Sequence, residues 1–181
     1  MVRIMENFNR TFFEILFRFA HRSFLLDDVI VFLGTYLPAL LVIAAIVLIF
    51  SQKGMRRRLF LFCELALAVI LSRGIVTEVI RFFYTHPRPA EALGIDALIV
   101  DTSRSFPSGH AMFFFAMAMV LLYWNKKWGT WFFVFAAVNG IARIIAGVHW
   151  PLDVLGGAVL GVLCAMVVHR LLEKQRRELE G

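Results

Sequence analysis

Residues 29–50 read VIVFLGTYLPALLVIAAIVLIF, a run of 22 residues without a charged side chain. A helix needs about 20 mostly apolar residues to cross the hydrocarbon core of a bilayer. Four more stretches meet or approach that length, at residues 59–83, 111–124, 131–148 and 152–172. The third stretch is short unless its helix begins near Pro107, where proline suits the first helical turn. The pattern predicts an all-α, polytopic membrane bundle with five spanning helices and a single membrane-embedded domain, residues 1–181.

The composition of the whole chain also indicates a bilayer environment. Of its 181 residues, 60% are hydrophobic and 18% are charged, against about 45–50% and about 25% in soluble domains. The net charge of +6 does not indicate a nucleic-acid partner, because the basic residues gather at the ends of apolar runs, where membrane topology places them. Cys63 and Cys164 lie inside apolar runs without zinc-ligand spacing, so we interpret them as small hydrophobic residues.

The first 25 residues have a different pattern. Apolar side chains recur at helical spacing on one face, and polar or charged side chains recur on the opposite face. The two sets are Phe8, Phe12, Ile15, Leu16 and Phe19, against Arg10, Glu14, Arg18 and His21. This pattern is typical of an amphipathic helix that lies in the membrane interface. A tilted sixth span is the alternative.

Three basic clusters determine the predicted orientation. They follow the first, third and last spans, and they consist of Lys53, Arg56, Arg57 and Arg58, of Lys126 and Lys127, and of Arg170, Lys174, Arg176 and Arg177. If five spans alternate in direction, all three clusters share one side, which the positive-inside rule makes cytoplasmic. The loop at residues 84–106 and the turn around His149 then face the extracytoplasmic side.

The first segment with chemical potential contains Arg81 and Arg88, which straddle the outer end of the second span. Anchoring at the headgroups is a sufficient explanation for either arginine alone, and Arg104 in the same loop has no stronger claim. The second segment, residues 107–110, reads Pro-Ser-Gly-His and opens the third span.

A helix N-terminus presents unpaired backbone N–H groups that favour a bound anion. Gly109 lets an oxyanion approach the backbone closely, and Ser108 can cap the helix or donate to a phosphate oxygen. A plain helix cap beside an interfacial histidine is the competing interpretation.

The third segment contains Arg143, His149 and Asp153. Arg143 lies near the outer end of an apolar span, and a charge there is by default a functional hypothesis. Pro151 marks the start of the last helix, so Asp153 falls in its first turn, within reach of His149. A carboxylate on one ring nitrogen fixes the tautomer and orients the other nitrogen toward a substrate. An aspartate cap beside a chance histidine is the competing interpretation.

The predicted topology brings the three segments to one membrane face. Together they supply three arginines, a helix N-terminus and two histidines, one of them backed by a carboxylate. Guanidinium groups bind phosphoryl oxygens bidentately, while one histidine can attack phosphorus and the other can protonate the leaving oxygen. Since no cluster of carboxylates offers a magnesium site, we expect phosphoryl hydrolysis without a metal or another cofactor.

The three segments resemble the motifs of the type 2 phosphatidic acid phosphatase superfamily, which are Lys-x6-Arg-Pro, Pro-Ser-Gly-His and Ser-Arg-x5-His-x3-Asp. They span residues 81–153. The resemblance implies that His149 is the nucleophile and forms a phosphohistidine, that Asp153 orients it, and that His110 is the general acid. It implies a phosphate site formed by Arg81, Arg88, Ser108, Gly109 and Arg143.

This chain departs from the superfamily pattern at two positions. Arg81 stands in place of the usual lysine, which keeps the charge and changes its shape. Ala142 stands in place of the usual serine, which removes one hydroxyl group. The other groups of the three motifs are present.

Within the superfamily, the sequences of residues 25–27 and 147–154 look like bacterial undecaprenyl pyrophosphate phosphatases of the bacitracin-resistance type. This resemblance implies a multi-pass enzyme of the bacterial plasma membrane that converts undecaprenyl diphosphate to undecaprenyl phosphate for cell-wall synthesis, with an extracytoplasmic site. Phosphatidylglycerophosphate and lipid A phosphatases share the motifs and stay open as alternatives. A lipid-phosphate binding or transport protein is a non-enzymatic alternative. A vanadium haloperoxidase has a similar anion site, but those enzymes are soluble. The lipid tail and the oligomeric state are left open.

Other polar residues within the apolar stretches are interpreted as structural; these are Glu64, Arg73, Glu78 and Asn139. Helical spacing lets Glu78 pair with Arg81, and Asp27 and Asp28 are expected to cap the first span. Three histidines without partners nearby in the sequence are interpreted as interfacial, namely His21, His86 and His169. Gly157 and Gly161 permit close helix packing, either within one molecule or between two copies.

Overall fold

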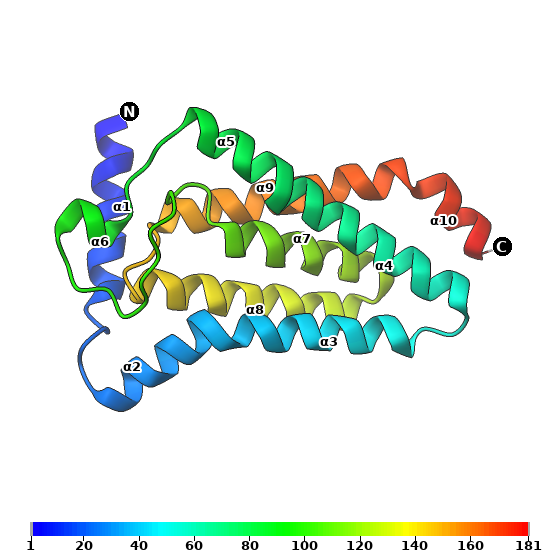
Figure 1. Ribbon diagram of the computed structural model, residues 1–181, viewed down its shortest axis with the longest axis horizontal. Coiled ribbons are helices and arrows are strands. Elements are labelled where there is room, and N and C mark those ends of the chain that lie inside the picture. Colours follow the sequence, from blue (N-terminus) through cyan, green and yellow to red (C-terminus); the bar gives the residue numbers. More distant parts are fainter. Residues whose placement is uncertain (1, 181) are drawn as a thin grey trace.

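The fold is a bundle of helices, seen in a computed structural model that describes residues 2–180. Every regular element in this part of the chain is a helix (Figure 1), as the sequence predicts. Among these described residues, four helical units are long and apolar enough to cross a membrane, and they are Phe24–Ser51, Met55–Phe83, Lys126–Ile145 and Pro151–Leu171. They correspond to the first, second, fourth and fifth predicted spans.

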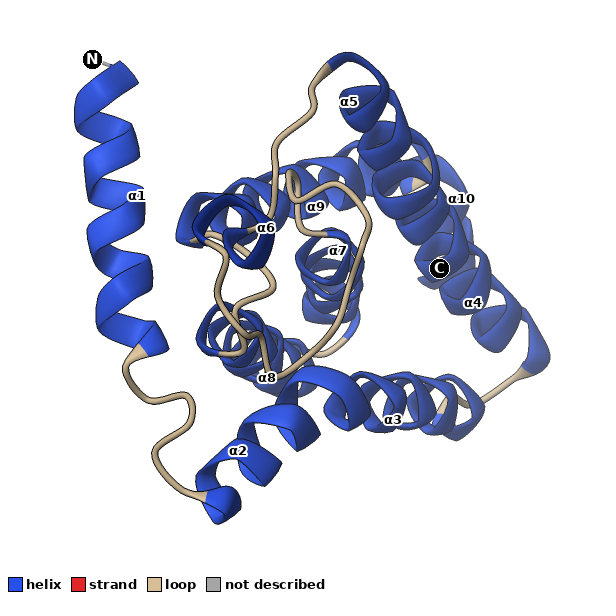
Figure 2. Ribbon diagram, turned by 60° about the vertical axis from the view of Figure 1, so that its left-hand side comes forward, coloured by secondary structure: helices blue, strands red, loops and turns tan. Residues whose placement is uncertain are grey.

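The third predicted span is the shorter helix α7, Gly109–Trp124. Its 16 residues extend about 24 Å, which is less than the hydrocarbon core of about 30 Å. Helix α7 packs most extensively against α8 (Lys126–Ile145) and α9 (Pro151–Leu171), and it lies at the centre of the bundle in Figure 2. Because protein surrounds α7, the non-helical residues before it can lie at membrane depth without facing lipid.

Two glycines of α9 bring this helix against α7. A Cβ atom on Gly157 would lie 2.8 Å from the carbonyl oxygen of Ser108, and one on Gly161 would lie 2.6 Å from that of Met112. Neither position can hold a side chain without moving backbone. The small-residue pattern is therefore used within one molecule, and it fixes the position of the backbone around Ser108.

Each of the first two spans contains a wider, π-helical segment. The first comprises α2 (Phe24–Val31), η1 (Phe32–Tyr36) and α3 (Leu37–Ser51). The second comprises α4 (Met55–Val69), η2 (Ile70–Val76) and α5 (Thr77–Phe83). Such segments are frequent at functional sites.

Carbonyl oxygens of the segment η1 accept hydrogen bonds from side chains of α8. Asn139 donates through its side-chain nitrogen to the carbonyls of Leu33 (2.7 Å) and Gly34 (3.3 Å). These bonds confirm the structural role predicted for Asn139.

The predicted cap of the first span is wrong. The cap is Ser23, whose hydroxyl oxygen accepts from the backbone N–H of Leu26, while Asp27 accepts from the backbone N–H of His21. The helix begins earlier than expected because the apolar run extends back through Phe24 and Leu25, which places both aspartates inside it.

Helix α1 (Val2–Phe17) crosses the bundle axis at one end, near the short helix α6 (Pro89–Leu93) (Figure 1). Its Phe13 is buried, with the ring centroid 5.1 Å from that of Trp150. Asn9 accepts a hydrogen bond of 3.0 Å from the backbone N–H of Leu152. Helix α1 therefore runs across the direction of the four long helical units (Figure 1).

The bundle has two distinct ends. We call the end with α1, α6 and the 146–150 turn the motif end, and the opposite end, with α10 (Glu173–Glu180), the tail end. The α3–α4 connection, the α7–α8 turn and α10 all lie at the tail end (Figure 1). The three basic clusters therefore share one end, as the orientation argument requires.

Candidate active site

His149 lies in the turn that joins α8 to α9. Gly147 has a φ of +82°, which costs little for glycine, and the backbone N–H of Val148 donates to the carbonyl of Arg143 at 3.1 Å. The turn directs His149 inward, so that only 1% of its surface is exposed. Burial lowers the pKa of His149 to about 4, and the charges of Arg88 and Arg143 add to the effect. The imidazole is therefore neutral at pH 7, as a nucleophile must be.

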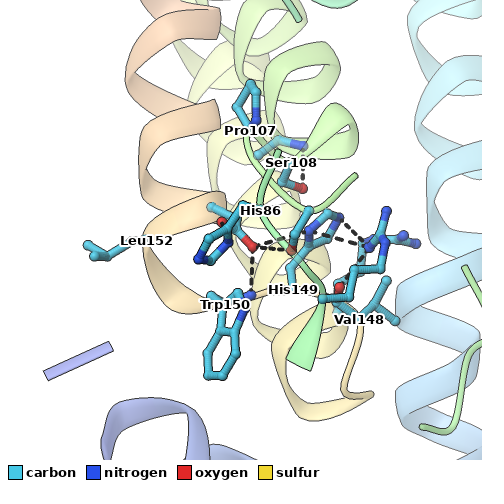
Figure 3. Close-up of polar contacts among 12 residues, drawn as sticks. His86, Pro107, Ser108, Val148, His149, Trp150 and Leu152 are labelled. Atoms are coloured by element: carbon cyan, nitrogen blue, oxygen red, sulfur yellow. Dashed lines mark hydrogen bonds and ion pairs between the residues drawn. The ribbon is translucent and has the colours of Figure 1, made fainter. Parts of the chain in front are cut away.

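Asp153 stands behind this imidazole in the first turn of α9. Its Oδ2 atom accepts from the backbone N–H of Trp150 at 2.9 Å and from the hydroxyl of Ser105, and it lies 3.7 Å from Nδ1 of His149 (Figure 3). A carboxylate on this side favours the proton on Nδ1 and leaves the lone pair of Nε2 for chemistry. The reach from Asp153 to His149 that the sequence predicts is thus present.

A second histidine lies on the same carboxylate. Nδ1 of His86 is 3.6 Å from Oδ1 of Asp153, and its ring stacks on Tyr84 with the centroids 5.9 Å apart. The neighbouring carboxylate of Asp153 raises the pKa of His86 above its ordinary value, and partial burial opposes this shift. The sequence analysis found no partner for His86 nearby along the chain, and the structure shows that its partner, Asp153, is distant in the sequence.

Arg88 stands on the other side of His149. Its Nη1 atom donates to the carbonyl of Val148 at 2.6 Å and lies 3.3 Å from Nε2 of His149. Its other nitrogens donate to the carbonyl (2.7 Å) and the hydroxyl (2.8 Å) of Ser103. The guanidinium is 96% buried, so this position reflects a built site rather than headgroup anchoring.

Asp101 bridges two of the predicted arginines, and the sequence analysis did not single it out. Its Oδ2 atom lies 2.8 Å from Nη2 of Arg88 and 3.1 Å from Nη2 of Arg143. Burial acts to raise the pKa of Asp101, but hydrogen bonds from Ser103 and the charge of Arg88 lower it overall. The carboxylate therefore stays ionised beside both guanidinium groups.

The remaining arginines have spare donors. Arg143 donates to the carbonyl of Gly34 at 3.3 Å, and Arg81 donates to the carbonyl of Pro107 at 3.0 Å. Within the described part of the chain, the Nε–H groups of both arginines are buried without a hydrogen-bond partner. Buried donors of this kind are costly unless something accepts from them, which favours a ligand with several oxygen atoms.

Ser108 caps α7, as predicted. Its hydroxyl oxygen accepts from the backbone N–H of Ala111 at 3.5 Å, and its own backbone N–H donates to the carbonyl of Asp153 at 3.0 Å. Gly109 and His110 follow in the first turn. A backbone hydrogen bond therefore connects Ser108, the cap of α7, to Asp153, the residue whose carboxylate stands behind His149.

One cavity joins these parts, with a volume of about 320 Å³, at the lower end of the range of small-molecule sites, roughly 300–1,000 Å³. Five predicted site residues line it: Arg81, Arg88, Gly109, His110 and His149. Ser108, Arg143 and Asp153 are not among the lining residues. They lie next to residues that are, Ser108 beside Gly109, Arg143 beside Asp101 and Asp153 beside His149. An apolar wall continues the cavity, formed by Pro38, Ala39, Val42, Phe113 and Phe114.

The cavity also contains a residue that was interpreted as structural. Arg73 lines it, and its Nη1 atom lies 2.6 Å from Oε1 of Glu78. The predicted pairing of Glu78 with Arg81 is wrong: Glu78 pairs with Arg73, five residues earlier across the end of the π-helical segment η2, and Arg81 donates to the carbonyl of Pro107.

Several site residues escaped the sequence analysis: His86, Asp101, Ser103 and Ser105. His86 lies within the first motif, and the other three lie in the loop between the first two motifs. Asp101 could have been found from the sequence, because it is a carboxylate in a loop that the predicted topology places on the same face as three arginines. Among residues 2–180, no group of three or more His, Cys, Asp or Glu side chains is arranged to hold a metal ion.

The chain is similar in sequence and in fold to known proteins. The sequence model of the PAP2 superfamily matches residues 61–177. The chain is 32% identical to the bacitracin transport permease protein BcrC of Bacillus licheniformis, over 80% of this chain and 70% of the relative. It is 27% identical to the undecaprenyl-diphosphatase BcrC of Bacillus subtilis, over 93% and 86%. The crystal structure of Aquifex aeolicus LpxE is similar, with a TM-score of 0.73 and 27% identity, over 90% of this chain and 95% of that one.

Proposed function

The chain belongs to the PAP2 superfamily and is a membrane lipid phosphatase, and from that premise we propose that it hydrolyses undecaprenyl diphosphate to undecaprenyl phosphate. The similarity to a relative named undecaprenyl-diphosphatase supports this substrate. We place the reaction at the extracytoplasmic face of a bacterial plasma membrane, because the three basic clusters share the tail end and the positive-inside rule makes that end cytoplasmic.

One observation carries the proposal: His149 is buried and held between Asp153 and Arg88 at the polar end of the cavity. A pocket that only binds a phosphate needs the arginines but not an oriented imidazole. The alternative of a non-catalytic lipid-binding protein leaves this arrangement unexplained.

The proposed reaction has two steps. Nε2 of His149 attacks the terminal phosphorus, the bond from phosphorus to the bridging oxygen breaks, and His110 gives its proton to that oxygen as the lipid phosphate leaves. Water then attacks the phosphohistidine, His110 takes a proton from the water, and inorganic phosphate leaves with His149 restored.

The arginines serve both steps. Arg81, Arg88 and Arg143, together with the N-terminus of α7 at Ser108 and Gly109, stabilise the charge on the equatorial oxygens. In this proposal the entering phosphate displaces the carboxylate of Asp101 from Arg88 and Arg143. No step requires a metal ion.

The apolar wall supports a lipid substrate. It is formed by α3 on one side and α7 on the other, directly beside the arginines. A lipid tail can thus lie along this wall while the phosphate stays at His149. The wall does not distinguish prenyl from diacyl chains, so phosphatidylglycerophosphate and lipid A stay as alternative substrates.

The test is phosphate release by the purified protein in detergent and EDTA, from undecaprenyl diphosphate and from phosphatidylglycerophosphate, with His149→Ala beside the wild type. We expect release by the wild type only, faster from the diphosphate. Faster release from phosphatidylglycerophosphate would overturn the substrate, and equal release by the variant would overturn the histidine mechanism.

A further inference from the structure

Arg73 is the one arginine of the cavity that the proposed mechanism does not use. It belongs to η2 in the second span, eight residues before Arg81, so its Cα lies about 12 Å deeper along that helix. Its side chain reaches the start of α7, where its Nε atom is 2.6 Å from the position that a Cβ atom on Gly109 would occupy. The guanidinium thus lies against the N-terminus of α7, which is part of the proposed phosphate site, on the side nearer the membrane interior.

This placement is electrostatically unfavourable for a residue with a purely structural role. The N-terminus of a helix carries a partial positive charge and repels a cation, and Arg81 lines the same cavity. Glu78 is the carboxylate paired with Arg73, at 2.6 Å, and the two side chains are 40% (Arg73) and 58% (Glu78) exposed. Such an exposed pair contributes little and is readily exchanged for another anion.

The surrounding groups also indicate a missing acceptor. The Nε–H of Arg81 is buried without a partner, and this residue is 93% buried overall. Arg81 and Arg73 both line the cavity, which continues along the apolar wall. The reacting phosphate can accept from Arg81, and an anionic group between that phosphate and the lipid tail would lie beside Arg73.

We propose that Arg73 binds the phosphate group that remains on the lipid, which makes it the residue that selects diphosphates over monophosphates. The inference rests on the proposed function and deepens it. The terminal phosphate lies at His149, Arg88 and the N-terminus of α7, the inner phosphate lies next to it at Arg73, and the tail follows the apolar wall. Glu78 holds Arg73 in place until the inner phosphate replaces it.

The test compares two substrates with the same tail, farnesyl diphosphate and farnesyl monophosphate, using the full-length protein in detergent. Arg73→Gln is expected to lower kcat/KM for the diphosphate about 10- to 100-fold, because a charge-assisted contact is lost. Its kcat/KM for the monophosphate is expected to stay within about twofold of the wild type, because no group contacts Arg73 in that complex. Arg104→Gln, which removes an exposed arginine from the loop before α7, is the matched control and should change neither value.

Inhibition supplies a readout that does not depend on turnover of the monophosphate. Farnesyl monophosphate is the product, and we expect it to inhibit diphosphate hydrolysis more weakly in Arg73→Gln. Inhibition by inorganic phosphate should stay unchanged, because free phosphate occupies the site at His149. If Arg73→Gln fails to fold, Glu78→Gln replaces it: freeing Arg73 should strengthen inhibition by farnesyl monophosphate, and unchanged inhibition would contradict the proposal.

An equal loss for both substrates, or no loss for either, would overturn the role of Arg73 while leaving the proposed function standing. Both proposals would be overturned if the wild-type protein hydrolysed phosphatidylglycerophosphate but hydrolysed neither undecaprenyl diphosphate nor farnesyl diphosphate.

Discussion

The motif end and the tail end of the bundle each hold a histidine beside a buried carboxylate, but the two pairs differ in their surroundings. At the tail end, Nδ1 of His169 lies 2.7 Å from Oε1 of Glu64, and Trp124 donates to the other oxygen at 2.7 Å. At the motif end, His149 is 3.7 Å from Asp153. The tail-end pair is a short, closed contact, and the motif-end pair is looser and opens on a cavity.

The neighbours of the two pairs explain the difference. His169 stacks on Tyr123 with the ring centroids 3.6 Å apart, and Arg176 donates to the carbonyl of Tyr123 at 2.8 Å. These contacts join α4, α7, α9 and α10. Around His149, by contrast, arginine donors outnumber the internal acceptors. We infer that the tail-end pair stabilises the fold, whereas the motif-end pair keeps binding capacity for a substrate.

The largest expected effect is at the motif end. Asp153→Asn removes the charge that orients His149, and we expect kcat/KM for undecaprenyl diphosphate to fall by about 10²–10⁴-fold, as in hydrolytic triads. Asparagine can still accept from the N–H of Trp150, so the thermal unfolding temperature should change little. A variant that keeps more than about a tenth of wild-type activity would remove the basis for the contrast between the two ends.

The tail end should show the opposite result. Glu64→Gln leaves His169 without its buried carboxylate, and we expect a loss of roughly 3 kcal/mol or more in stability, with kcat/KM of the folded protein unchanged. Thermal unfolding in detergent measures the first quantity and lipid phosphate hydrolysis the second. Glu91→Gln, at an exposed position, is the control; equal unfolding temperatures for the two variants would show that the Glu64 pair does not stabilise the fold.

The smallest effect concerns His86, which shares Asp153 with His149. Its folded pKa is raised, so its stabilising contribution is present below its unfolded pKa of about 6.5 and is lost as the pH rises through the folded pKa. We expect His86→Gln to lower Tm by roughly 1–3 °C at pH 5.5 and not at pH 8.5. A difference that is the same at both pH values would mean that His86 acts through packing alone.

The sequence predicts the parts of the site whose geometry is local. Ser108 and Gly109 begin a helix, and Asp153 follows His149 by one helical turn, so four residues of spacing are sufficient to bring them together. The fold class follows from apolar length, because a bilayer requires backbone hydrogen bonds to close within each segment.

The sequence does not predict the partners that are distant along the chain. Asp101 meets Arg143 across 42 residues, Ser105 meets Asp153 across 48, and Glu64 meets His169 across 105. The pairing of Glu78 with Arg73 was missed for a different reason: a π-helical segment alters the register that ordinary helical spacing assumes.

By itself, the sequence determined that this chain is a membrane bundle and which residues form the three motifs, because apolar length and helical spacing are properties of short segments. The tertiary structure alone decided which polar groups satisfy one another and which do not. The close contact of α9 with α7 at Gly157, the bridge at Asp101 and the placement of Arg73 against Gly109 all depend on packing between segments. The physical reason is that a buried charge takes the nearest partner in space, whatever its distance along the chain.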